Sequence, residues 1–145
     1  MNPYRILGII LLALMPLSQA LSQDALLTGS VIGTEQSVDY STGAASTTVN
    51  TCACAFDGNL DTYFASYERR LTWAGLDLGT PHVITRIGWA PRKDALGPQR
   101  TLLGVFEGAN RPDFLDALPL YVIDNAHPSG QIVYKDVDVS LGFRY

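Results

Sequence analysis

The sequence contains few of the side chains that usually build catalytic and metal centres. Among its 145 residues there are only two histidines, His82 and His127, and two cysteines. The histidines show no spacing typical of zinc ligands or of a Ser–His–Asp triad, so we expect both at the surface or at strand edges. The carboxylates are scattered, and none stands out as half of a glycosidase pair. The sequence therefore predicts a protein that is not an enzyme.

The two cysteines, Cys52 and Cys54, are separated by a single residue. In an extended strand their side chains would share a face, with Cα atoms near the upper limit for a disulfide. Three interpretations stay open: a strained local disulfide, pairing with another chain or segment, or two free thiols. A cysteine-only metal site would need two further soft ligands.

Positive charge is scarce as well. The formal net charge is −4 at pH 7, and loss of Arg5 with a leader would make it −5. A mildly acidic domain has no broad positive field to attract nucleic acid, so we expect no nucleic-acid partner.

Long apolar runs are limited to the start of the chain. Arg5 precedes an uncharged apolar core, Ile6 to Met15, and the small residues Ser18 and Ala20 fit the −3 and −1 positions of a cleavage site. This run is too short to span a bilayer of about 30 Å, although a membrane anchor is the alternative. We therefore predict a signal peptide over residues 1–20 and a secreted, extracellular product.

The rest of the chain consists of short apolar runs separated by turn residues, with no convincing helical period. Thr72 to Leu78 alternates cleanly, which places Trp73, Gly75 and Asp77 on one face of a strand. This pattern favours an all-β sandwich or barrel. Further runs are expected at residues 26–32, 82–90, 101–107, 118–123, 131–139 and 142–145, with loops at 41–51 and 94–98 and one helical turn near 114–118.

Several segments, in order, resemble the discoidin-like domain, the C-terminal domain type of coagulation factors 5 and 8. They are AFDGNLDTYFAS, TWAGLDLG, VITRIGWAPR and GVFEGANRPDF, which together extend from about Ala55 to Phe114, with a weaker continuation to Tyr145. The resemblance implies an eight-stranded jelly-roll sandwich of the galactose-binding-like superfamily, whose members include carbohydrate-binding modules. We divide the chain into the signal peptide, an N-terminal strand and Ser/Thr-rich loop (21–51), and the sandwich (52–145).

The resemblance also implies a structural calcium ion. Family members that bind sugars hold calcium near the start of the domain, and the matching ligands here are the Cys54 carbonyl, Asp57, Asn59 and Thr62. Calcium prefers hard oxygen ligands, which this loop offers. The alternative is that Asp57 only caps a turn. The family's last strand normally adds a Glu, which would lie beyond Tyr145, so we expect a C-terminally truncated product.

A different calcium motif overlaps the same loop. Asp57, Asn59, Asp61 and Glu68 occupy positions 1, 3, 5 and 12 of an EF-hand loop. Position 6 requires glycine for its sharp turn, but Thr62 stands there. The flanking residues are also not helical in pattern, so we set this interpretation aside.

Sugar recognition needs an aromatic surface and planar polar groups, and the candidate residues lie in predicted loops. Trp73 and Trp89 lie in predicted strands and are expected in the core. By the resemblance, Arg92 and Arg100 occupy the positions of two family arginines that often form structural ion pairs. Further loop candidates are Tyr63 and Phe114. The predicted ligand-binding residues are Tyr67, Arg69, Arg70 and Arg92.

The functional prediction is a secreted, non-catalytic carbohydrate-binding module that recognises galactose-like or other cell-wall glycans through loops at one end of the sandwich. Shallow loop sites bind weakly, so attachment to other domains would matter. Two alternatives stay open. One is a cell-surface adhesion module for a protein or for phospholipid, and the other is an accessory domain of a larger secreted hydrolase or oxidase.

Overall fold

The structure is a computed structural model that describes residues 25–145. The predicted signal peptide, residues 1–20, lies outside these residues. Within 25–145, no helix is both long and apolar enough to cross a membrane.

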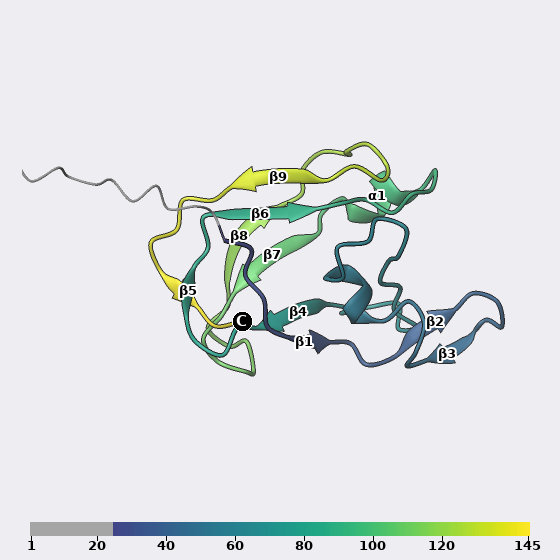
Figure 1. Cartoon of the computed structure of the whole chain (residues 1–145), viewed down its shortest axis with the longest axis horizontal. Helices are drawn as coiled ribbons and strands as arrows, with labels where there is room; N and C mark the ends of the chain where they lie inside the picture. The colour runs from purple at the N-terminus through teal and green to yellow at the C-terminus, as the bar shows by residue number, and fades with distance from the viewer. Residues whose placement is uncertain (1–24) are drawn as a thin grey trace, which may run out of the picture.

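The described chain is mostly β-structure, and its strands pair antiparallel (Figure 1). β6 and β9 lie along one side, β1 and β4 along the opposite side, and the pair β7–β8 crosses between them (Figure 1). The elements are β1 (Ser30–Gly33), β2 (Ser37–Asp39), β3 (Ala44–Ser46), the 3-10 helix η1 (Cys52–Ala55), β4 (Ala74–Asp77), β5 (His82–Val83), β6 (Arg86–Trp89), α1 (Gly97–Thr101), β7 (Val105–Gly108), β8 (Leu118–Val122), β9 (Val133–Asp136) and β10 (Gly142–Phe143).

A cluster of half-buried aromatic rings forms around Trp89. The Trp89 ring lies 5.5 Å from the rings of both Phe106 and Tyr121, and 5.3 Å from the His127 ring. His127 is therefore part of this cluster, although it is only half-buried and lies in the loop after β8. Burial of such rings is the main favourable term for a domain of this size.

Phe143 of β10 is a second buried anchor, with 3% of its surface exposed. Its ring lies so close to Gly108 that a Cβ there would meet ring atoms at 2.5 Å. Glycine at the end of β7 is thus what allows β10 to pack across it. The strand predicted at 142–145 is confirmed at Gly142–Phe143, where it pairs with β5.

The β2–β3 hairpin projects at one end of the molecule, on the right in Figure 1. Ser37 is fully buried at its base and its hydroxyl contacts the carbonyl oxygens of Ser46 at 2.9 Å and Val49 at 2.6 Å. A polar side chain at this buried place satisfies loop carbonyls that water cannot reach. This end of the molecule is called the hairpin end below.

Three local expectations were wrong. Part of the predicted loop 41–51 forms β3, because its polar residues bond within the hairpin. The helix α1 replaces the end of the predicted loop 94–98 and the start of the predicted strand 101–107; Pro98 suits its first turn. Val83, expected in the core, is 51% exposed on β5.

Candidate functional site

The oxygen-rich loop 57–62 follows η1 directly and bonds mainly to itself. The Asp57 carboxylate accepts the Asn59 backbone N–H at 2.8 Å, and its other oxygen lies 2.7 Å from the Thr62 hydroxyl. These bonds, the Thr62 hydroxyl above all, lower the pKa of Asp57. The carboxylate is therefore charged at neutral pH and points into the turn.

This loop gathers oxygen atoms that suit calcium. Thr62 Oγ1 lies 2.7 Å from Asp57 Oδ2 and 2.8 Å from the Asn59 carbonyl oxygen. Without an ion these contacts are hydrogen bonds made by the Thr62 hydroxyl, while calcium would be held by such carboxylate, carbonyl and hydroxyl oxygens at about 2.3–2.6 Å. Three of the predicted ligand residues therefore come together, and the fourth, Cys54, lies in η1 immediately before them. Between residues 25 and 145, no group of three or more His, Cys, Asp or Glu side chains could hold a metal, so carbonyl and hydroxyl oxygens would have to complete the site.

The EF-hand interpretation does not fit. An EF-hand loop lies between two α-helices, and here the loop follows a 3-10 helix and leads into bends and turns. Asp61, which that motif needs as a ligand, instead forms an ion pair with Lys93 at 2.6 Å.

Both cysteines are free thiols. The buried Cys52 thiol donates to the Thr34 carbonyl oxygen at 3.0 Å, and burial raises its pKa. Of the three interpretations of the pair, the structure has the free thiols, and Cys52 acts as a small packing residue beneath β1.

A hollow of about 520 Å³ opens at the hairpin end. It lies where the chain around residue 66 crosses the hairpin: Ser37 and Ser66 form a β-bridge, and Tyr67 donates its N–H to the Gln36 carbonyl at 3.0 Å. The hairpin pocket, as we call it, is lined by Val38, Tyr40, Gly43, Ser66, Tyr67 and Arg69.

Two of the predicted ligand-binding residues, Tyr67 and Arg69, meet in the hairpin pocket. Tyr67 is 48% exposed and Tyr40, across the hollow, is 59% exposed. Both can therefore offer ring surface to a ligand. Arg70 is exposed but does not line this pocket.

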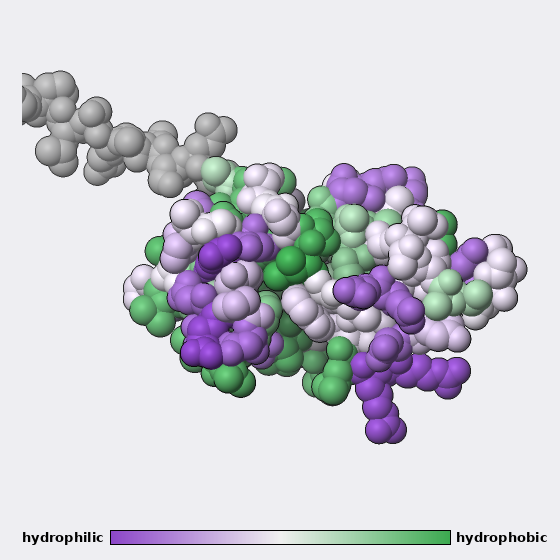
Figure 2. Space-filling view, turned by 90° about the horizontal axis from the view of Figure 1, so that it is seen from below, coloured by the Kyte–Doolittle hydropathy of each residue, from purple (hydrophilic) through white to green (hydrophobic). Residues whose placement is uncertain are grey.

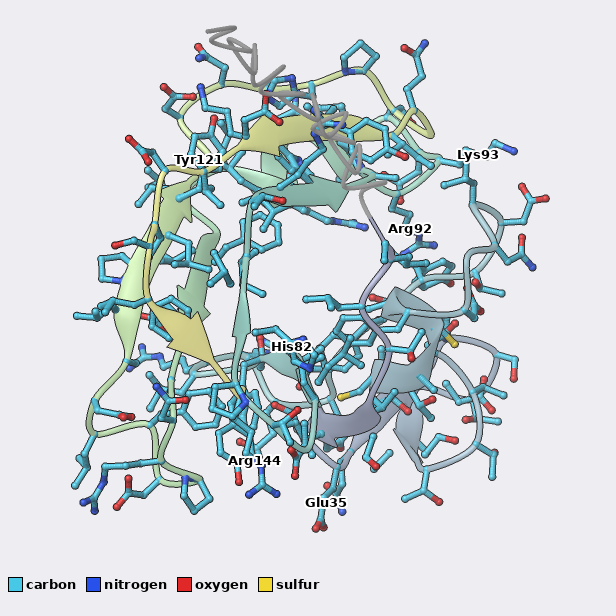
Figure 3. The ribbon with its side chains drawn as sticks, turned by 60° about the vertical axis from the view of Figure 1, so that its left-hand side comes forward. Glu35, His82, Arg92, Lys93, Tyr121 and Arg144 are labelled. Carbon is cyan, nitrogen blue, oxygen red and sulfur yellow. The ribbon has the colours of Figure 1, made fainter. Side chains whose placement is uncertain are left out.

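Arg92, the fourth predicted residue, is not in the lining of the pocket, and it lies near Lys93 in Figure 3. Its guanidinium lies 3.6 Å from the centre of the Tyr63 ring and 5.4 Å from that of Tyr40, and it pairs with Asp94 at 3.1 Å. Cation–π contacts of this kind hold the rings in place. Arg92 thus contacts the pocket through Tyr40.

Sequence reasoning missed Tyr40, Val38 and Gly43, because they reach the pocket only through the β2–β3 hairpin. A signal was present in the turn: Asp39 accepts the Ser41 N–H at 2.8 Å, and Gly43 has a φ of +73°. Aspartate that bonds the backbone two residues on, and glycine at a positive φ, are both typical of turns.

Trp73 lies outside the core, contrary to the sequence-based expectation. It is 44% exposed, next to a second depression of about 630 Å³ whose lining includes Phe114 and Tyr145. Trp89, by contrast, packs in the aromatic cluster as expected.

Comparison with solved structures identifies a relative. The chain is similar to the family 62 carbohydrate-binding module (CBM62) of Clostridium thermocellum Xyl5A, with 42% identity, a TM-score of 0.71, and coverage of 82% of this chain and 81% of that one. This chain belongs to carbohydrate-binding module family 62. No family model matches the sequence, and no curated protein matches it significantly.

Membership of family 62 confirms the predicted function class. The protein is a non-catalytic carbohydrate-binding module with a β-sandwich of the galactose-binding-like type, as the resemblance implied. In this family 62 module, the hairpin pocket combines two exposed tyrosine rings with an arginine side chain.

Proposed function

We propose that this module binds galactose-like sugars of cell-wall glycans in the hairpin pocket. The observation that carries the proposal is the convergence of Tyr40, Tyr67 and Arg69 on one open hollow. A tyrosine ring can pack against the apolar C–H face of a sugar, and a planar guanidinium donates several hydrogen bonds to hydroxyl oxygens. Family membership supports a carbohydrate ligand.

The local bonding favours a preformed pocket. Val38 donates its N–H to the Ala65 carbonyl at 2.8 Å, and the Ser66 hydroxyl oxygen accepts the Glu68 N–H at 3.0 Å. Backbone segments that are already tied together lose little conformational freedom on binding. Even so, an open pocket of this size is expected to bind a single sugar weakly, with a Kd near the millimolar end of the scale.

The test is isothermal titration calorimetry with galactose and with glucose. Arg69→Ala and Tyr67→Ala should each weaken galactose binding about tenfold or more, as loss of a central contact of about 1.4 kcal/mol does. Tyr134→Ala is the matched control, because Tyr134 is a 65% exposed tyrosine on β9. Arg70→Ala separates the two adjacent arginines. Unchanged affinity in Arg69→Ala and Tyr67→Ala would refute the pocket assignment.

A structural calcium ion at the 57–62 loop is part of the proposal. Asp57, the Asn59 carbonyl and Thr62 would hold it, with the Cys54 carbonyl as a further oxygen. Bound calcium would supply a fixed positive charge that ties these oxygens together. The ion would stabilise the end of the sandwich without contacting the sugar.

The wider setting is inferred from the relative. The C. thermocellum module is named as part of Xyl5A. We extend to this chain an attached catalytic domain and an extracellular location, which agree with the predicted signal peptide. The jelly-roll order of the strands and the relationship to discoidin-like domains remain predictions. Mass spectrometry of the exported protein would check removal of residues 1–20.

A phospholipid-binding role has one observation in its favour. Leu71 is 98% exposed directly after Arg69 and Arg70, so an apolar side chain and two cations project together. Such a group can contact an anionic membrane surface. Sedimentation with phosphatidylserine vesicles checks this role: binding that Leu71→Ser abolishes would favour it, and no binding would exclude it.

A further inference from the structure

The hairpin pocket contains a guanidinium group that no carboxylate of the described chain neutralises. Arg69 lines the pocket, and Arg70 follows it at the surface. Between residues 25 and 145, neither side chain takes part in a salt bridge or a hydrogen bond with another residue. Figure 2 shows strongly hydrophilic side chains that project from the right-hand part of the molecule, which contains the hairpin end. The positive charge at the pocket is therefore available to a ligand.

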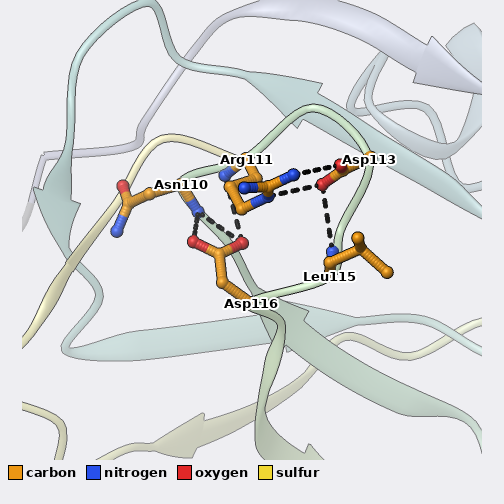
Figure 4. Close-up of polar contacts among 5 residues, drawn as sticks. All are labelled: Asn110, Arg111, Asp113, Leu115 and Asp116. Carbon is orange, nitrogen blue, oxygen red and sulfur yellow. Dashed lines mark hydrogen bonds and ion pairs between the residues drawn. The ribbon is translucent and has the colours of Figure 1, made fainter.

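The other arginines of the described residues differ from these two, because each forms an ion pair with an aspartate. The pairs are Arg86 with Asp136, Arg92 and Arg100 with Asp94, Arg111 with Asp113, and Arg144 with Asp77. Figure 4 shows the Arg111 pair, in which both carboxylate oxygens accept bonds from one guanidinium. The planar fork of a guanidinium matches the two oxygens of a carboxylate. Residues 25–145 thus supply a carboxylate to every arginine except the adjacent pair at the pocket.

Two acidic residues are close to the pocket in sequence, but neither lines it. Asp39 stands between the lining residues Val38 and Tyr40, and successive side chains of an extended segment point to opposite faces. Its carboxylate accepts the Ser41 N–H at 2.8 Å and the Ser41 hydroxyl at 2.6 Å, so it is engaged in the hairpin turn. Glu68 is exposed and also lies outside the lining. The wall of the pocket is therefore positive, although the whole chain has a net charge of −4.

The other polar groups of the lining also favour a ligand that accepts hydrogen bonds. Ser66 Oγ accepts the Glu68 N–H at 3.0 Å, which leaves the hydroxyl proton of Ser66 to be donated. A guanidinium carries five N–H donors and no acceptor, and the two tyrosine hydroxyls can donate as well. Among the described residues, no carboxylate or amide side chain lines this pocket. The side chains of the lining therefore offer more donors than acceptors.

A carboxylate on the ligand matches this excess of donors better than a further hydroxyl group does. A hydroxyl must donate as well as accept, whereas an ionised carboxylate only accepts and has about four sites for doing so. Bonds to a charged acceptor are also roughly twice as strong as those between neutral groups. The exposed rings of Tyr40 and Tyr67 would still contact the apolar face of the sugar.

We propose that the sugar bound in the hairpin pocket is a uronic acid, a galactose-like sugar whose carboxylate accepts a two-point bond from the Arg69 guanidinium. This rests on the proposed function and narrows its ligand to the acidic glycans of cell walls. Arg70 adds a second positive charge outside the lining. Because both arginines are exposed, the carboxylate stays partly hydrated and the gain in affinity is modest.

The test compares three ligands that differ in a single group: methyl galactoside, methyl galacturonoside as its sodium salt, and the methyl ester of that galacturonoside. Calorimetry at low salt should show that the wild type binds the charged ligand about fivefold more tightly than either neutral one. The ester has nearly the same shape as the acid, so the comparison isolates the charge. The preference should shrink at an ionic strength of about 1 M, where screening is strong.

Variants of the two adjacent arginines locate the effect. Arg69→Gln should remove the preference, so that charged and neutral ligands bind equally. Arg69→Lys should keep part of it, because lysine retains the charge but not the planar fork. Arg70→Gln is the matched control and should keep most of the preference, since Arg70 does not line the pocket. Thermal denaturation followed by circular dichroism shows whether the variants are folded, as the exposure of both arginines predicts.

Four outcomes would overturn the proposal. Equal wild-type affinity for the galactoside and the galacturonoside contradicts a uronic acid and leaves the proposed function standing, whereas no binding of any of the three ligands contradicts the proposed function itself. A preference that Arg69→Gln keeps and Arg70→Gln loses would place the charge effect outside the pocket. Sedimentation with phosphatidylserine vesicles that Arg69→Gln abolishes, without a preference for the charged sugar, would mean that an anionic membrane is the partner.

Discussion

Trp73 and Trp89 lie in similar alternating segments but have opposite surroundings. Trp89 is half-buried among the rings of Phe106, Tyr121 and His127, whereas Trp73 is 44% exposed on the β1–β4 side. Trp89 ends the alternating strand β6, whereas Trp73 lies immediately before β4. The difference teaches that alternation assigns residues to a face of a strand, and that the neighbouring chain decides whether that face is covered.

The largest expected effect contrasts the stability of the two sites. Trp89→Ala should reduce the free energy of unfolding by about 3–5 kcal/mol, because it leaves a cavity in the aromatic cluster. Trp73→Ala should cost only about 1 kcal/mol. Urea denaturation followed by circular dichroism gives both values. Equal losses in the two variants would mean that Trp73 is a core residue after all.

Calcium bound at the 57–62 loop should have the next largest effect. At a free calcium concentration about 100 times its Kd, binding would stabilise the fold by about 2.7 kcal/mol. Differential scanning calorimetry with calcium and with a chelator checks this. Asp57→Asn should abolish the difference, while Asp61→Asn, which alters the ion pair with Lys93, should retain it. No difference in the wild type would refute the site.

Arg92→Ala should have a smaller effect, which is a weaker binding of galactose in the hairpin pocket. Loss of the contacts with Tyr63 and Tyr40 removes about 0.5–1 kcal/mol each. Galactose affinity should therefore fall a few-fold. Arg92→Lys should restore part of the loss. An effect of tenfold or more would point to direct contact between Arg92 and sugar.

The smallest expected effect depends on pH. Bonds from Arg144, and then from the Gly79 N–H, hold the pKa of Asp77 below its ordinary value of 3.8. Their contribution to stability is complete above that pH and is lost as pH falls through the lowered pKa. The difference in thermal midpoint between the wild type and Asp77→Asn should therefore shrink below about pH 4. A difference that grows in acid would contradict the pairing.

Much of the fold could be predicted where strands alternate apolar and polar residues. The segment predicted at Thr72 to Leu78 became β4 at Ala74–Asp77, and the segment at 118–123 became β8 at Leu118–Val122. The β2–β3 hairpin was missed because Ser37 is buried through hydrogen bonds rather than through apolar surface. Polar residues with this role look like an ordinary loop in the sequence.

The candidate site was predictable only in part, for a related reason. Tyr67 and Arg69 stand together in a polar loop, so their composition alone pointed to a binding rim. Tyr40 comes from a distant hairpin, and Phe114 reaches Trp73 because its backbone adopts a positive φ. Contacts between distant segments and strained backbone conformations leave little trace in local pattern.

Gly75 lies beneath the Trp73 indole and leaves room there for a small side chain. An added Cβ at this position would lie at ordinary contact distance from the Trp73 indole and the Ile32 side chain, 3.5 and 3.7 Å. Alanine should therefore fit, and progressively larger residues would lift the ring outward from the strand pair. A single position beneath the indole would thus set how far the Trp73 ring stands out from the β1–β4 pair, while the residues around it stay the same.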